Sequence, residues 1–434
     1  MLVVLDCEAA TKMQNPMQKT TNRSLFKGVN MELSSRVKSM SESVTLKLNS
    51  KAQEMTEEGL QVYNLTAGQL PFRPPQEFID AIRFELDFLK SYQYSPVGGF
   101  LDLKKKLINY VEESRGIILD QEKFSCVVSN GAKHSISNIL GALIEPDDEV
   151  IIIAPYWISY PEMIKFCRGK PVVVQSSVFD VFTPSVNDIK KAINSKTKAI
   201  IINSPNNPAG IHYSREWMIE FGELLLKHPN IAVISDEIYF EVSYYDPKPT
   251  YFYQEFPELL AQTIIVDGIS KAFASTGLRI GYAIGPKNIC KGIENLQGQL
   301  TSSANSLIQR ALMSYQFNSS AQFLIPVKNH LRDNAIIIRE TLKKYNLMKC
   351  WYQPTSAFYF MIDFSQAPVF QRFKKDPHGD CSYEMCEEIL NKYAVVIVPG
   401  SDFGLKNSAR ISLVLQKEAM QEAMEKIVQF LIQT

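Results

Sequence analysis

One lysine in the sequence stands in a setting that suits covalent chemistry. Lys271 follows the apolar run "TIIVDG" (263–268), is surrounded by Ala, Ser, Thr and Gly residues, and has Arg279 eight positions later. An amine in a desolvated, small-residue setting has a lowered pKa, and it can then form an imine with a carbonyl compound. Taken alone, such a lysine is more often a surface amine at the end of a strand, so its neighbours decide the interpretation.

Other polar and aromatic residues follow apolar runs in the same manner. Ligands of an open parallel sheet bind at the carboxyl ends of its strands, so these residues are expected to share one site. Small residues that open a helix after a strand also leave N–H groups free for a phosphate. The residues are Trp157 after "EVIIIA", Asn207 after "AIIINS", Asp236 and Tyr239 after "IAVIS", and the segment "NGAKHS" after "CVVS".

This set of side chains suits a flat, phosphorylated heteroaromatic aldehyde. The lysine would take the carbonyl, the carboxylate would keep a ring nitrogen protonated so that the ring accepts electrons, and the tryptophan would stack on the ring. These are the requirements of pyridoxal 5′-phosphate. Dinucleotide, nucleotide and serine-hydrolase sites lack their motifs here, because the sequence has no G-x-G-x-x-G, no P-loop and no G-x-S-x-G. The five histidines have no ligand-like spacing, so we assign no metal.

The elements that must position these residues alternate along the middle of the chain. Runs dense in Val and Ile, without polar alternation, are typical of strands buried on both faces, and the stretches between them have helical periodicity. This order predicts an α/β fold, a doubly wound domain around a mostly parallel seven-stranded sheet. The runs are 126–129, 149–154, 171–175, 199–204, 231–235, 263–268 and 279–285.

After Asn288 the alternation of apolar runs and helical stretches ends, and long segments with helical periodicity run to about residue 346. Short strands and a final helix from Lys417 follow, which predicts a smaller α+β domain. A helical pattern from Leu33, with Ser34 as its N-cap, is expected to join that domain. We therefore divide the chain into an N-terminal extension or arm (1–30), an N-terminal helix of the small domain (31–65), a large cofactor domain (66–320) and a small C-terminal domain (321–434).

Composition and charge argue against several classes of partner. Lys and Arg total 46, as do Asp and Glu, so a zero net charge gives no basis for binding nucleic acid or a membrane by bulk charge. The seven cysteines are scattered without a C-x-x-C pair, as free thiols in a reducing compartment would be. We find no signal-peptide pattern and no apolar stretch of the roughly 20 residues that span a membrane, so we expect a cytoplasmic protein.

Three segments resemble the signature segments of a known family. The stretches "NSPNNPAG" (203–210), "SDEIYFEVSYYD" (235–246) and "SKAFASTGLRIGYAIGP" (270–286) are similar to those of the class I aminotransferases, the fold-type-I pyridoxal-phosphate enzymes. The look is closest to the aspartate aminotransferase branch, which includes prephenate aminotransferases. The resemblance extends over about residues 33 to 434, with the segments in the family's order.

The resemblance implies a role for each matching residue. Lys271 would form the imine with pyridoxal phosphate and move the substrate Cα proton, Asp236 would pair with the pyridine nitrogen, and Tyr239 would contact the ring's 3′ oxygen. Arg410, in "ARISLVL", would clamp the substrate α-carboxylate with its fork of donors. Tyr94 would reach the phosphate in a partner subunit, so the resemblance implies a homodimer with shared active sites. The other implied cofactor-binding residues are Gly131, Ala132, Lys133, Trp157, Asn207, Ser270 and Arg279, and the substrate-binding residues are Gly68, Trp157, Asn207 and Arg410.

The chain departs from the family pattern near the substrate rather than near the cofactor. It reads "TAGQLPF" (66–72) where the family usually reads "TAGEPDF". Ser41 replaces a frequent lysine, and Ser356 replaces the glycine of "PxGAFY". The candidates for contacting a second substrate carboxylate are Lys133, Ser43 and Thr45.

The function expected from the sequence is ping-pong transamination. An L-amino acid with an aspartate-, glutamate- or aromatic-like side chain would give its amino group to a 2-oxo acid, in amino acid metabolism or biosynthesis. The same cofactor cage supports elimination and cyclisation, so a related lyase or cyclase acting on an amino acid is the alternative. A non-catalytic amino acid sensor is a more distant alternative, because residues 1–30 are too short and too little basic for the DNA-binding domain that such regulators usually carry.

Overall fold

The computed structural model describes residues 32–38, 44–348, 352–374 and 379–434. By their contacts, the described residues up to Lys38 and those from Val44 onward belong to two separate units. The first unit holds helix α1 (Ser35–Lys38), where the Val37 amide donates to the Ser34 hydroxyl at 3.4 Å, the bond expected of an N-cap. The extension expected at residues 1–30, together with Ser41 and Ser43, lies outside the described residues.

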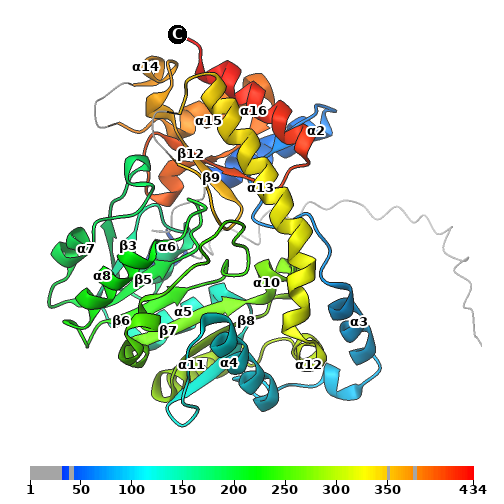
Figure 1. The fold of residues 1–434 in the computed structure, drawn as a ribbon, viewed down its shortest axis with the longest axis vertical. Helices are drawn as coiled ribbons and strands as arrows, with labels where there is room; N and C mark the ends of the chain where they lie inside the picture. Colours follow the sequence, from blue (N-terminus) through cyan, green and yellow to red (C-terminus); the bar gives the residue numbers. More distant parts are fainter. Residues whose placement is uncertain (1–31, 39–43, 349–351, 375–378) are drawn as a thin grey trace, which may run out of the picture. The chain divides into compact units, whose positions relative to one another are not determined.

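The second unit contains, among the described residues, a seven-stranded sheet in the order β2-β8-β7-β6-β5-β3-β4 (Figure 1). Strand β8 is antiparallel to both of its neighbours and the other neighbouring pairs are parallel, so the predicted mostly parallel sheet is confirmed. Each predicted apolar run forms one strand. The strands are β2 (Phe124–Ser129), β3 (Glu149–Ile153), β4 (Lys170–Val174), β5 (Thr197–Asn203), β6 (Ala232–Asp236), β7 (Thr263–Gly268) and β8 (Gly281–Pro286).

Both faces of this sheet are buried. Successive residues of strand β2 belong to two different hydrophobic clusters. Val127 belongs to the cluster that contains residues of helix α5 (Ala132–Leu143), and Val128 belongs to the other, larger cluster. Burial on both faces explains why Val and Ile fill these strands without polar alternation. The other helices of this region are α3 (Gln76–Glu85), α4 (Leu101–Arg115), α6 (Ser159–Phe166), α7 (Val186–Ala192), α8 (Arg215–Leu225), α9 (Phe252–Glu255), α10 (Ile269–Ala272), α11 (Lys287–Leu300), α12 (Ser306–Ser314) and α13 (Ser320–Lys344).

In the described part of the chain, two smaller sheets lie apart from the main sheet in sequence, and one of them pairs an N-terminal strand with a C-terminal one. An antiparallel sheet has the order β11-β12-β9, and β1 pairs in parallel with β10. Helix α16 (Lys417–Leu431) begins at the predicted residue and contacts the long α13, as Figure 1 shows. The remaining elements are β1 (Tyr63–Asn64), β9 (Tyr359–Asp363), β10 (Val395–Val396), β11 (Val398–Pro399), β12 (Ser408–Ser412), α2 (Val44–Glu57), α14 (Phe370–Phe373) and α15 (Ser382–Tyr393). Short 3₁₀ helices are η1 (Leu89–Tyr92), η2 (Val178–Asp180), η3 (Pro257–Gln262), η4 (Thr276–Leu278), η5 (Phe317–Ser319), η6 (Phe364–Gln366) and η7 (Gly400–Phe403).

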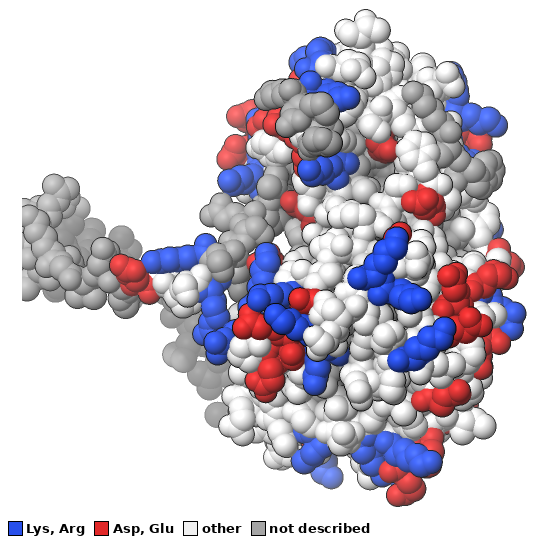
Figure 2. Space-filling view, turned by 90° about the vertical axis from the view of Figure 1, so that its left-hand side faces the viewer, with Lys and Arg blue, Asp and Glu red and all other residues white. Residues whose placement is uncertain are grey.

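Basic and acidic side chains are interspersed over the face of the molecule drawn in Figure 2, in keeping with the zero net charge. Exposed ion pairs occur on the surface of the described residues, such as Lys170 with Asp147 at 2.7 Å. Within the described ranges, no helix has both the length and the apolar character needed to cross a membrane.

The carboxyl ends of β5, β6 and β7 lie side by side and carry the first site residues. Asn203 pairs with Asp236 across β5 and β6, and Asp236 pairs with Val266 across β6 and β7. Lys271 follows the end of β7 in helix α10. The parallel register therefore brings Asp236 and Lys271 to one edge of the sheet, as the strand-end argument predicted.

Candidate active site

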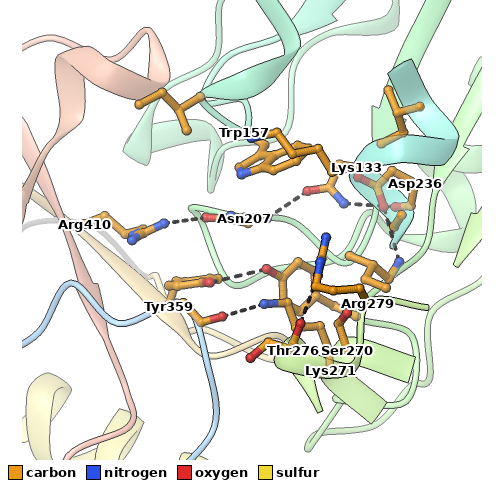
Figure 3. Close-up of a pocket in the computed structure, with 17 residues that line it drawn as sticks. Lys133, Trp157, Asn207, Asp236, Ser270, Lys271, Thr276, Arg279, Tyr359 and Arg410 are labelled. Carbon is orange, nitrogen blue, oxygen red and sulfur yellow. Dashed lines mark hydrogen bonds between the residues drawn. The ribbon is translucent and has the colours of Figure 1, made fainter. Parts of the chain in front are cut away.

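A cavity of about 410 Å³ lies at this edge of the sheet (Figure 3). Gly131 adjoins it, because a Cβ built on this glycine would lie 2.5 Å from the Arg279 guanidinium. Tyr94 does not line it, and its side chain is 91% exposed. Of the residues singled out in the sequence, the cavity brings together Gly68, Ala132, Lys133, Trp157, Asn207, Asp236, Tyr239, Ser270, Lys271, Arg279 and Arg410.

Lys271 points its amine into this cavity. Its Nζ donates a hydrogen bond to the Gly68 carbonyl oxygen. Burial lowers the pKa of Lys271 to about 8, and the positive charges of Arg410 and Arg279 act in the same direction. More of this amine is therefore unprotonated near neutral pH than of an ordinary lysine, and the unprotonated form is the one that attacks a carbonyl group.

Asp236 is a buried carboxylate at the end of β6. Tyr160 donates its hydroxyl to Oδ2 at 2.5 Å, and the Asn203 side-chain amide donates to the Asp236 carbonyl oxygen at 2.9 Å. Burial raises the pKa of Asp236 to about 6, although the hydrogen bond from Tyr160 opposes the rise. A cation placed against this carboxylate would favour its ionised form, so the site suits a protonated ring nitrogen.

The N-terminus of α5 forms an anion cradle at the cavity wall. The first N–H groups of a helix, here those of Ala132 and Lys133, have no intrahelical acceptor. Gly131 has φ +90°, and its missing side chain leaves room for Arg279, which donates to the carbonyl oxygens of Thr276 (2.9 Å) and Asn130 (3.2 Å). Ser270 adds a hydroxyl to the lining. Such a combination of N–H groups, a guanidinium and a hydroxyl suits a phosphate.

Flat and polar groups complete the cavity walls. The Trp157 indole packs edge-on against Tyr160, with 5.4 Å between ring centroids, and so presents a fixed face. The backbone N–H of Asn207 donates to Asn203 Oδ1 at 2.9 Å, which ties the loop after β5 to the end of that strand. Tyr239, 4% exposed, is held in the wall after β6. These contacts fix an aromatic face, an amide and a phenol around the space between Lys271 and Asp236.

Arg410 enters the cavity from β12, a strand of the small antiparallel sheet. Its Nη1 donates to Asn207 Oδ1 at 3.0 Å and its Nη2 to the Thr66 carbonyl oxygen at 2.9 Å. The Nε of this buried guanidinium has no hydrogen-bond partner among the described residues, and burial lowers its pKa. A carboxylate would supply the missing acceptor and the countercharge.

Several cavity residues were not identified in the sequence. Asn203 is the last residue of β5, and the strand-end argument could have included it. Thr276 lies within the quoted stretch around Lys271, but its type carries no chemical signal of its own. Tyr359 lies within the apolar segment "AFYFMIDF" (357–364) and has the pattern of a core aromatic residue. The apolar lining residues Ile136, Ile158 and Ile238 are indistinguishable from core residues in the sequence.

The candidates for a second carboxylate contact have different outcomes. Lys133 lines the cavity, with Nζ 5.2 Å from the Trp157 ring centroid, and burial lowers its pKa. Ser43 and the side chain of Thr45 lie outside what the structure describes. Ser356, which is not one of these candidates but replaces the family's usual glycine, is fully buried, and its backbone N–H donates to the Gly210 carbonyl oxygen at 3.0 Å.

Comparisons with known proteins show which family the chain resembles over most of its length. The family model described as aminotransferase class I and II matches residues 61–427. The aspartate aminotransferase of Geobacillus stearothermophilus is 34% identical over 401 residues, covering 92% of this chain and 99% of the relative. The aspartate/prephenate aminotransferase of Nitrosomonas europaea is 33% identical, covering 92% of this chain and 100% of the relative. The solved aspartate aminotransferase from Thermus thermophilus with maleate has a TM-score of 0.83 and 31% identity, covering 93% of this chain and 100% of that one.

Proposed function

The chain belongs to the aminotransferase class I and II family, whose enzymes transfer amino groups with pyridoxal 5′-phosphate, and we propose that its preferred donor is an acidic amino acid, aspartate or glutamate. It is a transaminase, and its acceptor is a 2-oxo acid. The observation that carries the proposal is the single cavity shared by Lys271, Asp236, Arg410 and Lys133.

The cavity residues fit the cofactor in shape and charge. We propose that the N-terminus of α5, with Ser270 and Arg279, binds its phosphate, since the gap left at Gly131 and the unpaired N–H groups form an anion cradle. The Trp157 indole would stack on the pyridine ring. Asp236 would face the ring nitrogen. Burial raises the pKa of this carboxyl group, and a protonated ring nitrogen would supply the positive charge that its ionised form lacks.

Each remaining group of the site then has a chemical task. When bound, pyridoxal phosphate supplies an electron sink for the electrons released at the substrate Cα. Lys271 would accept the Cα proton at Nζ and return it, and its lowered pKa suits that exchange. Asp236 would hold a proton on the pyridine nitrogen, and Tyr239 and Asn207 would hold the ring's 3′ oxygen. Arg410 would fix the α-carboxylate, and thereby the direction of the Cα–H bond.

A second cation supports an acidic donor. Lys133 lines the same cavity from α5, and Figure 3 shows it across the cavity from Arg410. A dicarboxylate could be held by both cations at once, whereas a donor with one carboxylate leaves Lys133 without a countercharge. The relatives named aspartate and aspartate/prephenate aminotransferases support the same donor class.

The separate half-reactions test this function. Purified protein loaded with pyridoxal phosphate is mixed with single L-amino acids, and the visible absorbance of the bound cofactor is followed. Aspartate or glutamate should bleach the absorbance fastest and form one equivalent of 2-oxo acid, and a fresh 2-oxo acid should restore it. Release of ammonia without any 2-oxo acid acceptor would instead support the lyase alternative, and a faster neutral donor would contradict the acidic preference.

Arg410→Lys tests the proposed carboxylate clamp. A lysine keeps the charge but loses the two-pronged geometry, so we expect kcat/KM for aspartate to fall about 10- to 100-fold, as the loss of one or two charge-assisted hydrogen bonds predicts. Most of the change should be in KM, measured by steady-state kinetics. Arg215→Lys, an exposed pair with Glu255, serves as the matched control and should leave kcat/KM unchanged. Equal values for both variants would contradict the clamp.

We also propose a homodimer that shares its active sites. Tyr94 is 91% exposed, and nearby apolar side chains are exposed too: Leu89 by 73%, Tyr92 by 65% and Leu101 by 63%. Such a run of exposed apolar groups is typical of an interaction surface. Sedimentation should give twice the chain mass of 49.2 kDa, and the double variant Leu89→Asp with Leu101→Asp should shift the protein toward a single chain. A parent protein that sediments as one chain would contradict the dimer.

The remaining sequence-based expectations stay predictions. They are the large domain at 66–320, the small domain built from 31–65 and 321–434, the cytoplasmic location and the biosynthetic role. The domain division is supported by the smaller sheets, because all of their strands lie outside 66–320.

A further inference from the structure

Tyr359 is a buried cavity residue that the proposed function does not use. It opens β9, lines the cavity and is 1% exposed. A buried tyrosine hydroxyl normally has a hydrogen-bond partner, and its ring is rigid, so its surroundings indicate what the residue does.

The backbone of Tyr359 is anchored on the loop that carries Asn207. Gly210 ends this loop at φ +69°, and a Cβ built on it would lie 2.1 Å from the Tyr359 carbonyl oxygen. The Thr355 and Ser356 amides donate to the Gly210 carbonyl oxygen at 2.8 and 3.0 Å. Close backbone contact therefore fixes Tyr359 relative to Asn207 before any ligand binds.

The hydroxyl of Tyr359 faces Tyr239. The two phenolic oxygens are 3.3 Å apart, and the rings meet edge-on with centroids 5.9 Å apart. The pKa of Tyr239 is raised well above its usual range, mainly by burial and to a smaller extent by the neighbouring Tyr359. Tyr239 has one proton, so if it donates to the cofactor's 3′ oxygen, its own oxygen is left to accept the proton of Tyr359.

The ring of Tyr359 supports Arg410. The strand register sets Met361 opposite Arg410, so Tyr359 is its diagonal neighbour on the same face of the sheet. The guanidinium carbon is 4.4 Å from the Tyr359 ring centroid, within cation–π range. Among the described residues, no carboxylate lies within ion-pair distance of Arg410. An aromatic face holds the guanidinium without neutralising it, which leaves its charge for a substrate.

We propose that Tyr359 is a positioning residue that links the two halves of this site: its hydroxyl orients the phenol of Tyr239, and its ring holds Arg410 in place. The proposal rests on the roles proposed above for Tyr239 and Arg410. It assigns the two effects to different atoms of one side chain, so two substitutions separate them.

Tyr359→Phe removes the hydroxyl and keeps the ring. Without the hydrogen bond from the Tyr359 hydroxyl, the Tyr239 hydroxyl donates less strongly to the 3′ oxygen of the cofactor. The negative charge on that oxygen is then less stabilised, so the bound cofactor loses its proton at a higher pH. We therefore expect the pH midpoint of the bound cofactor's visible absorbance to move upward and kcat to fall about 3- to 10-fold. The dissociation constant of succinate, a dicarboxylate without an amino group, should change less than about twofold, because the ring that supports Arg410 is retained.

Tyr359→Leu removes the ring as well. We expect the succinate dissociation constant, measured by calorimetry on the cofactor-free and the loaded protein, to rise about 3- to 30-fold. Tyr359→Met, whose unbranched side chain adapts to an irregular space, replaces the leucine variant if that one does not fold. Tyr244→Phe is the matched control: its hydroxyl is buried, has no partner among the described residues and lies outside the cavity, so no parameter should change.

The outcomes separate this proposal from the proposed function. A Tyr359→Phe variant with the parent's pH midpoint and kcat, or a leucine or methionine variant with the parent's affinity for succinate, overturns the positioning role while the parent remains an active transaminase. A parent protein that neither takes up pyridoxal phosphate nor binds succinate overturns the proposed roles of Tyr239 and Arg410, and this proposal with them.

Discussion

Replacing Lys271 by alanine is expected to reduce transamination by more than about 1,000-fold. The amine is the group proposed both to bind the cofactor carbonyl and to move the Cα proton, and a positioned acid–base group alone contributes up to about 10,000-fold. Among the described residues, the other lysine that lines the cavity is Lys133, whose side chain is proposed above to contact the second carboxylate of the substrate. The measurement is the single-turnover rate with aspartate, together with the visible absorbance of the protein after incubation with pyridoxal phosphate.

The control for this variant is Lys227→Ala, which removes an exposed lysine outside the cavity and should leave both readouts unchanged. The parent adds a pH signature. Because the pKa of Lys271 is lowered to about 8, the free amine becomes more abundant as the pH rises toward that value, and cofactor capture by the cofactor-free protein should accelerate with it. Two results would show that another group carries the reaction. One is a rate of cofactor capture that rises only when the pH approaches the pKa of an ordinary lysine. The other is a Lys271→Ala variant with the turnover of the parent.

The main sheet and the location of the site could be predicted from the sequence because both depend on local patterns. Runs such as 149–154 are rich in β-branched residues without polar alternation, and this composition is required of a strand buried on both faces. The strand-end rule then converts sequence position into spatial position. Asp236 and Lys271 are far apart in the chain, yet they meet because each follows a strand of the same parallel sheet.

The contacts that tune the site could not be predicted because they join residues with no shared local pattern. Tyr160 donates to Asp236 from helix α6, and in the sequence it is one of many tyrosines. Tyr359 meets Arg410 only through the register of β9 and β12, which the sequence does not specify. Where a family pattern was matched, as at Arg410, the residue was found, although strand periodicity alone would have left it as a solvated charge.

Asp236→Asn is expected to reduce transamination about 100- to 1,000-fold, the cost of removing one preorganised electrostatic partner. Asparagine keeps the size of the side chain but cannot hold a proton on the pyridine nitrogen, so the ring accepts electrons less readily. The rate of the half-reaction with aspartate measures the effect. Tyr160→Phe is the companion variant, because it removes only the 2.5 Å hydrogen bond to Asp236 and keeps the carboxylate, so its loss should be about tenfold or less.

The pH dependence of cofactor binding tests the same carboxylate independently of turnover. The folded protein without cofactor holds the pKa of Asp236 at about 6, above the ordinary value of 3.8, so between these values the folded state binds the extra proton and stability falls as the pH rises. A cationic ring nitrogen placed against Asp236 offsets the free-energy cost of ionising this buried carboxylate. The affinity for pyridoxal phosphate should therefore increase as the pH rises through about 6 and Asp236 ionises. The phosphate itself ionises in the same range, so the informative quantity is the difference between parent and Asp236→Asn. The parent should gain more affinity than the variant across that range, and equal gains would place the ring nitrogen away from Asp236.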